Sequence, residues 1–70
     1  MSIEAHTSRG ILIRLEMCED IVIIRCGKIL VFGGITPNER AWIEDMVDNL
    51  SLEETVNNVF RRIRTIQTVA

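Results

Sequence analysis

The stretch IVIIRCGKILVFGG, residues 21–34, decides the fold of this chain. Residues 21–24 are apolar at both odd and even positions and strongly β-branched, which is typical of a central strand covered on both faces. The pair Cys26-Gly27 predicts a two-residue hairpin turn, because glycine supplies the positive φ that such turns need. Residues 29–32 then predict the returning strand, which Gly33-Gly34 ends. The stretch therefore predicts an antiparallel hairpin that is rich in apolar residues.

The same turn sets the expected register of the hairpin. Counting outward from it pairs Arg25 with Lys28 and Ile24 with Ile29. Directly opposed like charges are unfavourable, so a three-residue loop with a bulge is the alternative.

A third strand precedes the hairpin. From residue 11 to residue 17 the odd positions are all apolar, whereas the even positions are Leu12, Arg14 and Glu16. This alternation predicts a strand with one buried face. Residues 18–20 are polar and suit a short connecting turn. Residues 1–9 are mixed in composition, so we expect a flexible N-terminal tail there, ahead of a single small α+β domain over residues 10–70.

Two helix starts follow the hairpin. Thr36, Pro37 and Glu39 suit the N-cap, the first and the third helical positions, which makes a capping box. Apolar side chains then recur in one stripe, at residues 43, 46, 47 and 50. A second capping pattern begins at Ser51, and apolar residues up to position 66 recur at helical spacing, with acids first and arginines last. A strand over residues 52–66 is the alternative, but neither parity collects the apolar residues cleanly.

These elements predict an α+β fold in which a three-stranded antiparallel meander is followed by two helices, in the order β-β-β-α-α. The chain has 70 residues, of which 47% are hydrophobic and 26% charged, with a net charge of −2. This composition excludes a disordered chain and weakens the case for nucleic-acid binding over the whole surface. The first residues lack the apolar run of a secretory signal, and no stretch reaches the roughly 20 apolar residues of a membrane span. We therefore expect a cytoplasmic protein that does not span a membrane.

Residue types that carry catalysis or bind metals are sparse. Cys18 and Cys26 fall at opposite ends of the predicted central strand, too far apart for a disulfide, and His6 is the only histidine. These side chains lack the paired spacing of a zinc site and offer no nucleophile–base pair. The acidic residues suit helix caps and a solvated helix face, and Gly33-Gly34 matches no phosphate-binding motif. We therefore predict no catalytic residue, no metal and no cofactor, and a protein that is not an enzyme.

The sheet carries the leading functional hypothesis. Its central strand is apolar on both faces, so two helices on one face would leave the other uncovered; one helix on each face is the alternative. A large uncovered apolar face is typical of an interface. The predicted interface residues are Trp42, Leu12, Ile23, Leu30 and Phe32, and Trp42 is either an interface anchor or a residue that flanks the core. We therefore expect a small homo-oligomeric module, a homodimer in the simplest case, for protein–protein interaction or regulation, with a protein partner besides its own copy.

Arg61, Arg62 and Arg64 form the only basic cluster of the sequence. They complement the dipole of the second helix and keep its surface soluble. The same residues suit contact with phosphates or with an acidic partner. A nucleic-acid-associated regulator that uses this helix is the alternative function, although nucleic acid is the less favoured partner because lysine and arginine are sparse elsewhere.

Two segments resemble parts of known families. Residues 27–35, with Glu39-Arg40 and residues 56–58, resemble part of the BON domains, which are bacterial envelope and lipid-interaction modules, and the resemblance implies a strand over residues 55–60. Residues 29–47 resemble the strand, Gly-Gly turn and helix of DinI-like damage-response regulators. Each resemblance covers about half of the chain with motifs common to any strand–turn–helix unit, so we assign the chain to neither family.

Overall fold

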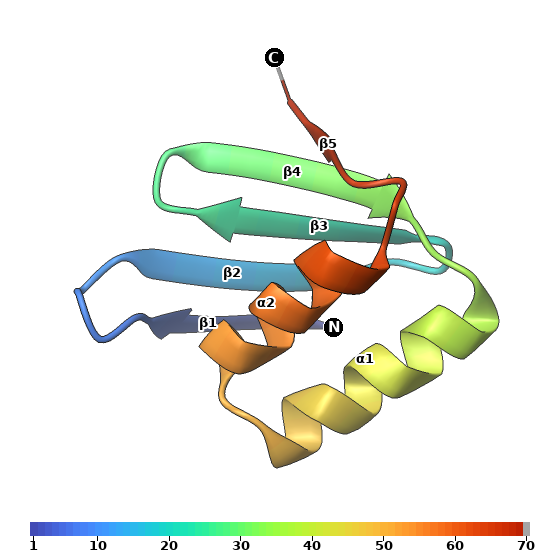
Figure 1. Ribbon diagram of the computed structural model, residues 1–70, viewed down its shortest axis with the longest axis horizontal. Coiled ribbons are helices and arrows are strands. Elements are labelled where there is room, and N and C mark those ends of the chain that lie inside the picture. Colours follow the sequence, from blue (N-terminus) through green and yellow to red (C-terminus); the bar gives the residue numbers. More distant parts are fainter. Residues whose placement is uncertain (70) are drawn as a thin grey trace.

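The computed structural model describes residues 1–69, which form one antiparallel sheet and two helices (Figure 1). In chain order the elements are β1 (Ser2–His6), β2 (Leu12–Met17), β3 (Ile21–Cys26), β4 (Ile29–Gly34), α1 (Pro37–Asn49), α2 (Leu52–Arg62) and β5 (Gln67–Thr68). The strands lie side by side in the order β1-β2-β3-β4-β5, and every neighbouring pair is antiparallel. The α+β class is thus confirmed, but the order β-β-β-α-α is incomplete: four strands precede the helices and a short fifth strand follows them.

The additional first strand lies in the segment that we expected to be a tail. Ile3 and Ala5 point to the same face of the sheet as Ile13 and Leu15 and pack against the core. Because β1 offers only these two apolar side chains, its alternation is too short to stand out in the sequence. Pairing with β2 supplies the missing stabilisation, since a strand gains most of its energy from cross-strand neighbours.

The hairpin between β3 and β4 turns one residue later than predicted. Cys26 pairs with Ile29, so the turn residues are Gly27 and Lys28. Gly27 has a φ of 60° and Lys28 has no positive φ, which fits a turn of type II′ with glycine at its first central position. The shift moves Arg25 from opposite Lys28 to opposite Leu30 and so removes the like-charged pair without a bulge.

Both helices begin where the sequence indicates. Thr36 accepts a hydrogen bond from the backbone N–H of Glu39, and the Glu39 carboxylate accepts one from the backbone N–H of Thr36, so the capping box is complete. Ser51 caps α2 by accepting from the N–H of Glu54, and its hydroxyl donates to the Glu54 carboxylate, so the second half of the capping box is not formed there. The segment left open between helix and strand is helical as far as Arg62, which also conflicts with the strand that a BON domain would place at residues 55–60.

After α2 the chain turns back across the sheet toward β4. A Cβ atom at Gly33 would lie 3.0 Å from the Cδ1 of Ile66 and 3.1 Å from its backbone nitrogen. Gly33 therefore allows the returning chain to cross close to the strand. Just before the crossing, the Thr65 hydroxyl donates to the carbonyl of Gly34 over 2.8 Å, and beyond it β5 adds to the edge of β4.

The hydrophobic core lies between the two helices and one face of the sheet. It contains Ile13, Leu15, Met17, Val22, Ile24, Val31, Ile35, Ile43, Leu52, Val56, Val59 and Ile63. The strand residues in this set lie on one face of the sheet, and residues of α1 and α2 belong to the same cluster. Figure 1 shows α2 in front of β1 and β2, with α1 beside α2 and below the edge strand β1 in this view. Of the two arrangements that the sequence left open, the structure adopts the one with both helices on a single face.

Candidate interaction surface

The face of the sheet turned away from the helices, called the open face below, is the main candidate site. Registered pairing arranges its side chains in rows across the strands. One row, the Glu16 row, contains Ser2, Glu16, Ile23 and Phe32. The next row, the Arg14 row, contains Glu4, Arg14, Arg25 and Leu30. No side chain of the two rows belongs to the buried core.

The open face has an apolar half over β3 and β4. Ile23 and Phe32 are direct cross-strand partners, and Ile21 and Leu30 lie next to them along their own strands. Phe32 and Ile21 are each 39% exposed, and Ile23 and Leu30 are half-buried. Neighbouring large side chains of this kind form a continuous apolar patch, because same-face neighbours on paired strands stand within contact range.

The other half of the open face, over β1 and β2, is polar and internally paired. The Arg14 guanidinium binds the Glu4 carboxylate over 2.8 Å, and a longer contact of 3.5 Å joins it to Glu16. The hydrogen bond that Arg14 donates to Glu4 and the charges of both acids raise the pKa of Arg14 above its ordinary value. Leu12 lies at the end of this half, next to His6 of β1.

Arg25 sits at the boundary between the two halves. It is half-buried and directly opposite Arg14, so the two arginines are cross-strand neighbours. Its Nη1 donates to the backbone carbonyl of Gly27 over 3.4 Å. Within residues 1–69 no carboxylate lies within ion-pair distance of Arg25, whereas Arg14 has two. The open face therefore carries one positive charge for which residues 1–69 supply no counter-charge within ion-pair distance.

Trp42 lies on the opposite side of the molecule. It is half-buried, packs against the core from α1, and is covered by the guanidinium of Arg62, which lies 3.9 Å from the centre of its ring. A cation over an indole face at this distance is favourable. The contact joins the two helices, and it separates Trp42 from the other four predicted interface residues, Leu12, Ile23, Leu30 and Phe32, which all lie on the open face.

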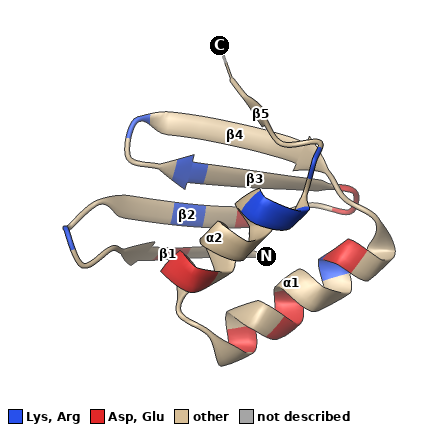
Figure 2. Ribbon diagram, in the orientation of Figure 1, with Lys and Arg blue, Asp and Glu red and all other residues tan. Residues whose placement is uncertain are grey.

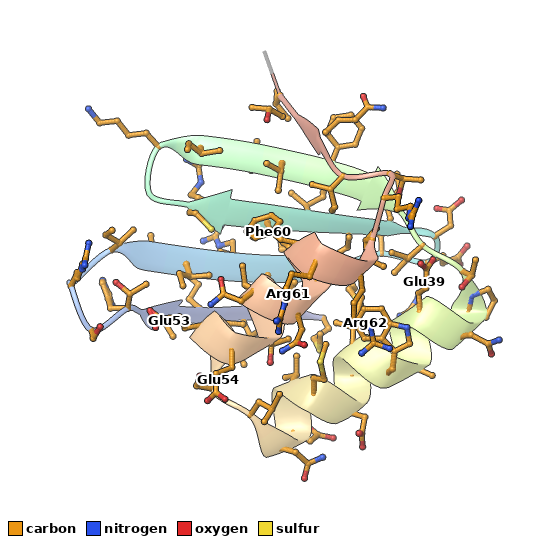
Figure 3. The ribbon with its side chains drawn as sticks, viewed as in Figure 1. Glu39, Glu53, Glu54, Phe60, Arg61 and Arg62 are labelled. Atoms are coloured by element: carbon orange, nitrogen blue, oxygen red, sulfur yellow. The ribbon has the colours of Figure 1, made fainter. Side chains whose placement is uncertain are left out.

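The arginine cluster occupies the C-terminal end of α2 and the residues just after it. Arg61 donates to the side-chain oxygen of Asn58 over 3.1 Å, and Arg62 stacks on Trp42. Figure 3 shows Arg61 and Arg62 at one end of this helix and Glu53 and Glu54 at the other, the order that complements a helix dipole. Figure 2 shows acidic positions along α1 beside it. The basic surface is therefore small and adjoins a negative one.

The described residues offer little for catalysis or metal binding. Cys18 is exposed in the turn before β3 and Cys26 is half-buried at the far end of the same strand; both thiols are free. Between residues 1 and 69 there is no cavity and no group of three or more potential metal ligands. Neither helix is long and apolar enough to cross a membrane.

Comparison with known proteins places this chain in no family: no family model, no curated protein and no solved structure matches it.

Sequence reasoning identified the apolar side chains of the open face but missed its charges. Strand parity alone assigned Leu12, Ile23, Leu30 and Phe32 to one side. The proximity of Arg25 to Arg14 depends on the register between β2 and β3. The observed register comes from a two-residue turn at Glu19-Asp20, since the N–H of Cys18 donates to the carbonyl of Ile21. A three-residue turn at residues 18–20 would instead have set Arg14 opposite Ile24.

Proposed function

We propose that this protein is a small non-catalytic binding module that associates with a second copy of itself through the open face. The observation that supports this most directly is the position of both helices on one side of a sheet that is apolar on parts of both sides. Burying Ile23, Leu30 and Phe32 against a partner removes apolar surface from water, which is the main favourable term in association.

The size of the open face indicates a weak, reversible dimer. Four strands spaced by about 4.8 Å and six residues rising about 3.3 Å each give a footprint of roughly 380 Å² per subunit. Two such footprints fall below the roughly 1,200–2,000 Å² of a stable interface. A module that associates in the micromolar range and exchanges its partners suits a regulatory role, in which a protein partner competes for the same face.

Sedimentation equilibrium from low micromolar to near-millimolar concentration tests the proposal. The wild-type chain is expected to shift from monomer to dimer across this range, and Phe32→Asp is expected to remain monomeric. Phe60→Asp is the matched control, because Phe60 is also 39% exposed but projects from α2 on the helix side (Figure 3).

Two results would overturn the proposal. One is a wild-type chain that stays monomeric at the highest concentration. The other is a dimer that Phe60→Asp weakens as much as Phe32→Asp does. Circular dichroism of both variants establishes that each is folded.

A further inference from the structure

We infer that two copies pack open face to open face about a two-fold axis that runs across the strands, so that Glu16 of each subunit lies between Arg14 and Arg25 of the partner subunit. This inference rests on the proposed self-association and adds its geometry. It follows from the order of charges on the two rows and from the symmetry that a dimer of identical faces requires.

The direction of the axis follows from the two halves of the open face. In the aligned class of sheet packing the strands of the two sheets lie within about 30° of each other, and in this class the axis runs nearly along the strands or nearly across them. An axis along the strands lays β1 over β4 of the partner subunit and brings Glu4 onto Leu30. An axis across the strands lays each strand over its own copy, so the apolar half meets the apolar half and the polar half meets the polar half.

The position of the axis follows from the charges. An axis that passes through the Arg14 row would oppose Arg14 to Arg14 and Arg25 to Arg25. An axis through the Glu16 row would oppose Glu16 to Glu16. An axis between the two rows places each row over the other row of the partner, which brings Glu16 over Arg14 and Phe32 over Leu30. Of the three positions, only this one puts opposite charges together, and like charges across an interface are strongly disfavoured.

The same position gives Arg25 the counter-charge that the described part of its own chain does not supply. Arg25 then lies over Ile23 of the partner subunit, and Ile23 has Glu16 as its cross-strand neighbour. Glu16 is therefore within reach of both Arg14 and Arg25 of the partner. Its contact with Arg14 of its own chain is the longer of the two that Arg14 makes, at 3.5 Å, so Glu16 gives up little by turning toward the partner.

One further pairing comes from the ends of the sheet. Lys28 lies one row beyond the Arg14 row, and Gly34 lies one row beyond the Glu16 row, so the axis across the strands places Lys28 over Gly34 of the partner subunit. Asp20 adjoins Gly34: its carbonyl oxygen would lie 3.8 Å from a Cβ atom at Gly34 and accepts from the N–H of Ile35. Lys28 and Asp20 of two subunits thus come together.

Zero-length cross-linking with a carbodiimide tests this geometry, because Lys28 is the only lysine of the chain. An equal mixture of ¹⁵N-labelled and unlabelled protein, cross-linked at concentrations where sedimentation finds the dimer, is expected to give mixed-label peptides that join Lys28 to Asp20 or to Glu19. Asp20→Asn with Glu19→Gln removes this link, and Lys28→Arg removes it while keeping the charge.

The alternative axis predicts a different result. An axis along the strands carries Lys28 to the turn at residues 7–11 of the partner, which contains no carboxylate. A sedimenting dimer without the Lys28–Asp20 or Lys28–Glu19 link overturns the inferred geometry and leaves the proposed self-association standing. A monomer in sedimentation overturns both.

Charge reversal provides an independent test of the Glu16 contacts. Glu16→Arg alone and the pair Arg14→Glu with Arg25→Glu alone are each expected to weaken the dimer at least tenfold. An equal mixture of the two variants is expected to recover one-to-one dimers, because each face then meets its complement. Glu44→Arg on α1 is the control and is expected to leave the dimer unchanged. Failure of the mixture to dimerise, with both variants folded, overturns the pairing.

Discussion

Alanine at Gly33 is expected to destabilise the fold, whereas alanine at the adjacent Gly34 is not. Neither glycine has a positive φ, so both positions accept an L side chain as far as the backbone is concerned. At Gly33 the added Cβ meets the Ile66 backbone nitrogen at 3.1 Å. Because this neighbour is a backbone atom, the close contact is relieved only if the returning chain moves. At Gly34 the nearest atom, the Asp20 carbonyl oxygen, is an ordinary contact at 3.8 Å.

The comparison of the two variants isolates the cost of the close approach. Replacing glycine with alanine lowers the entropy of the unfolded chain and stabilises by about 0.4–1 kcal/mol where the native conformation is compatible. This contribution is common to both variants and cancels in their difference. Crowding an extra methyl group into a filled site costs about 1–3 kcal/mol, so Gly33→Ala is expected to be less stable than Gly34→Ala by that amount.

Thermal unfolding followed by circular dichroism measures this difference directly. In a domain of this length 1 kcal/mol corresponds to about 4–8 °C, so the Tm of Gly33→Ala is expected at least about 4 °C below that of Gly34→Ala. A displaced returning chain would also lose the hydrogen bond from the Thr65 hydroxyl to Gly34, and the loosened β5 would show faster amide exchange. Equal Tm values for the two variants would show that the chain does not cross β4 at Gly33.

Three further predictions concern other parts of the molecule. Thr36→Ala removes the capping box of α1 and is expected to cost about 1 kcal/mol in a urea titration, an expectation that an unchanged midpoint would contradict. Burial raises the pKa of the Cys26 thiol, so the neutral thiol stabilises the fold below the ordinary thiol pKa, and this stabilisation is lost as the pH rises from there through the raised value. Cys26→Ala should flatten this alkaline decline in the free energy of unfolding, and an unchanged decline would refute the assignment. Arg61→Glu with Arg64→Glu is expected to leave self-association unchanged in sedimentation; salt-sensitive binding of the wild type to a DNA or RNA duplex, lost in this variant, would favour the nucleic-acid function instead.

The parts of the fold that could be predicted from sequence are those governed by neighbours along the chain. Both helix starts depend on residues three apart, as in Thr36 and Glu39, and the strands β2 to β4 carry strong local patterns. The strand β1 and the short β5 are stabilised by pairing with distant residues, and their own side chains carry little signal. The predicted hairpin turn differs from the observed one by one residue, because a positive φ at Gly27 is compatible with either the first or the second central position of the turn. Only the cross-strand partner of Arg25 distinguishes these two positions.

The candidate site divides in the same way. The apolar residues of the open face follow from strand parity, which a single strand determines. The pairing of its charges follows from register across three strands, which no local pattern contains. Trp42 shows the same limit: the sequence left it as an interface anchor or as a residue that flanks the core, and its packing against the core under Arg62 depends on how α1 and α2 meet.

The order of the strands also bears on how the chain forms its structure during synthesis. Each of β1 to β4 pairs with the strand made just before or after it, so these four strands need no long loop closure and are expected to pair quickly. The helices that shield its core face are made later, and α2, which contributes Leu52, Val56 and Val59, is completed near the end. Until then a nascent sheet exposes apolar residues on both sides, and its open face is available to any neighbouring copy that is being translated from the same mRNA.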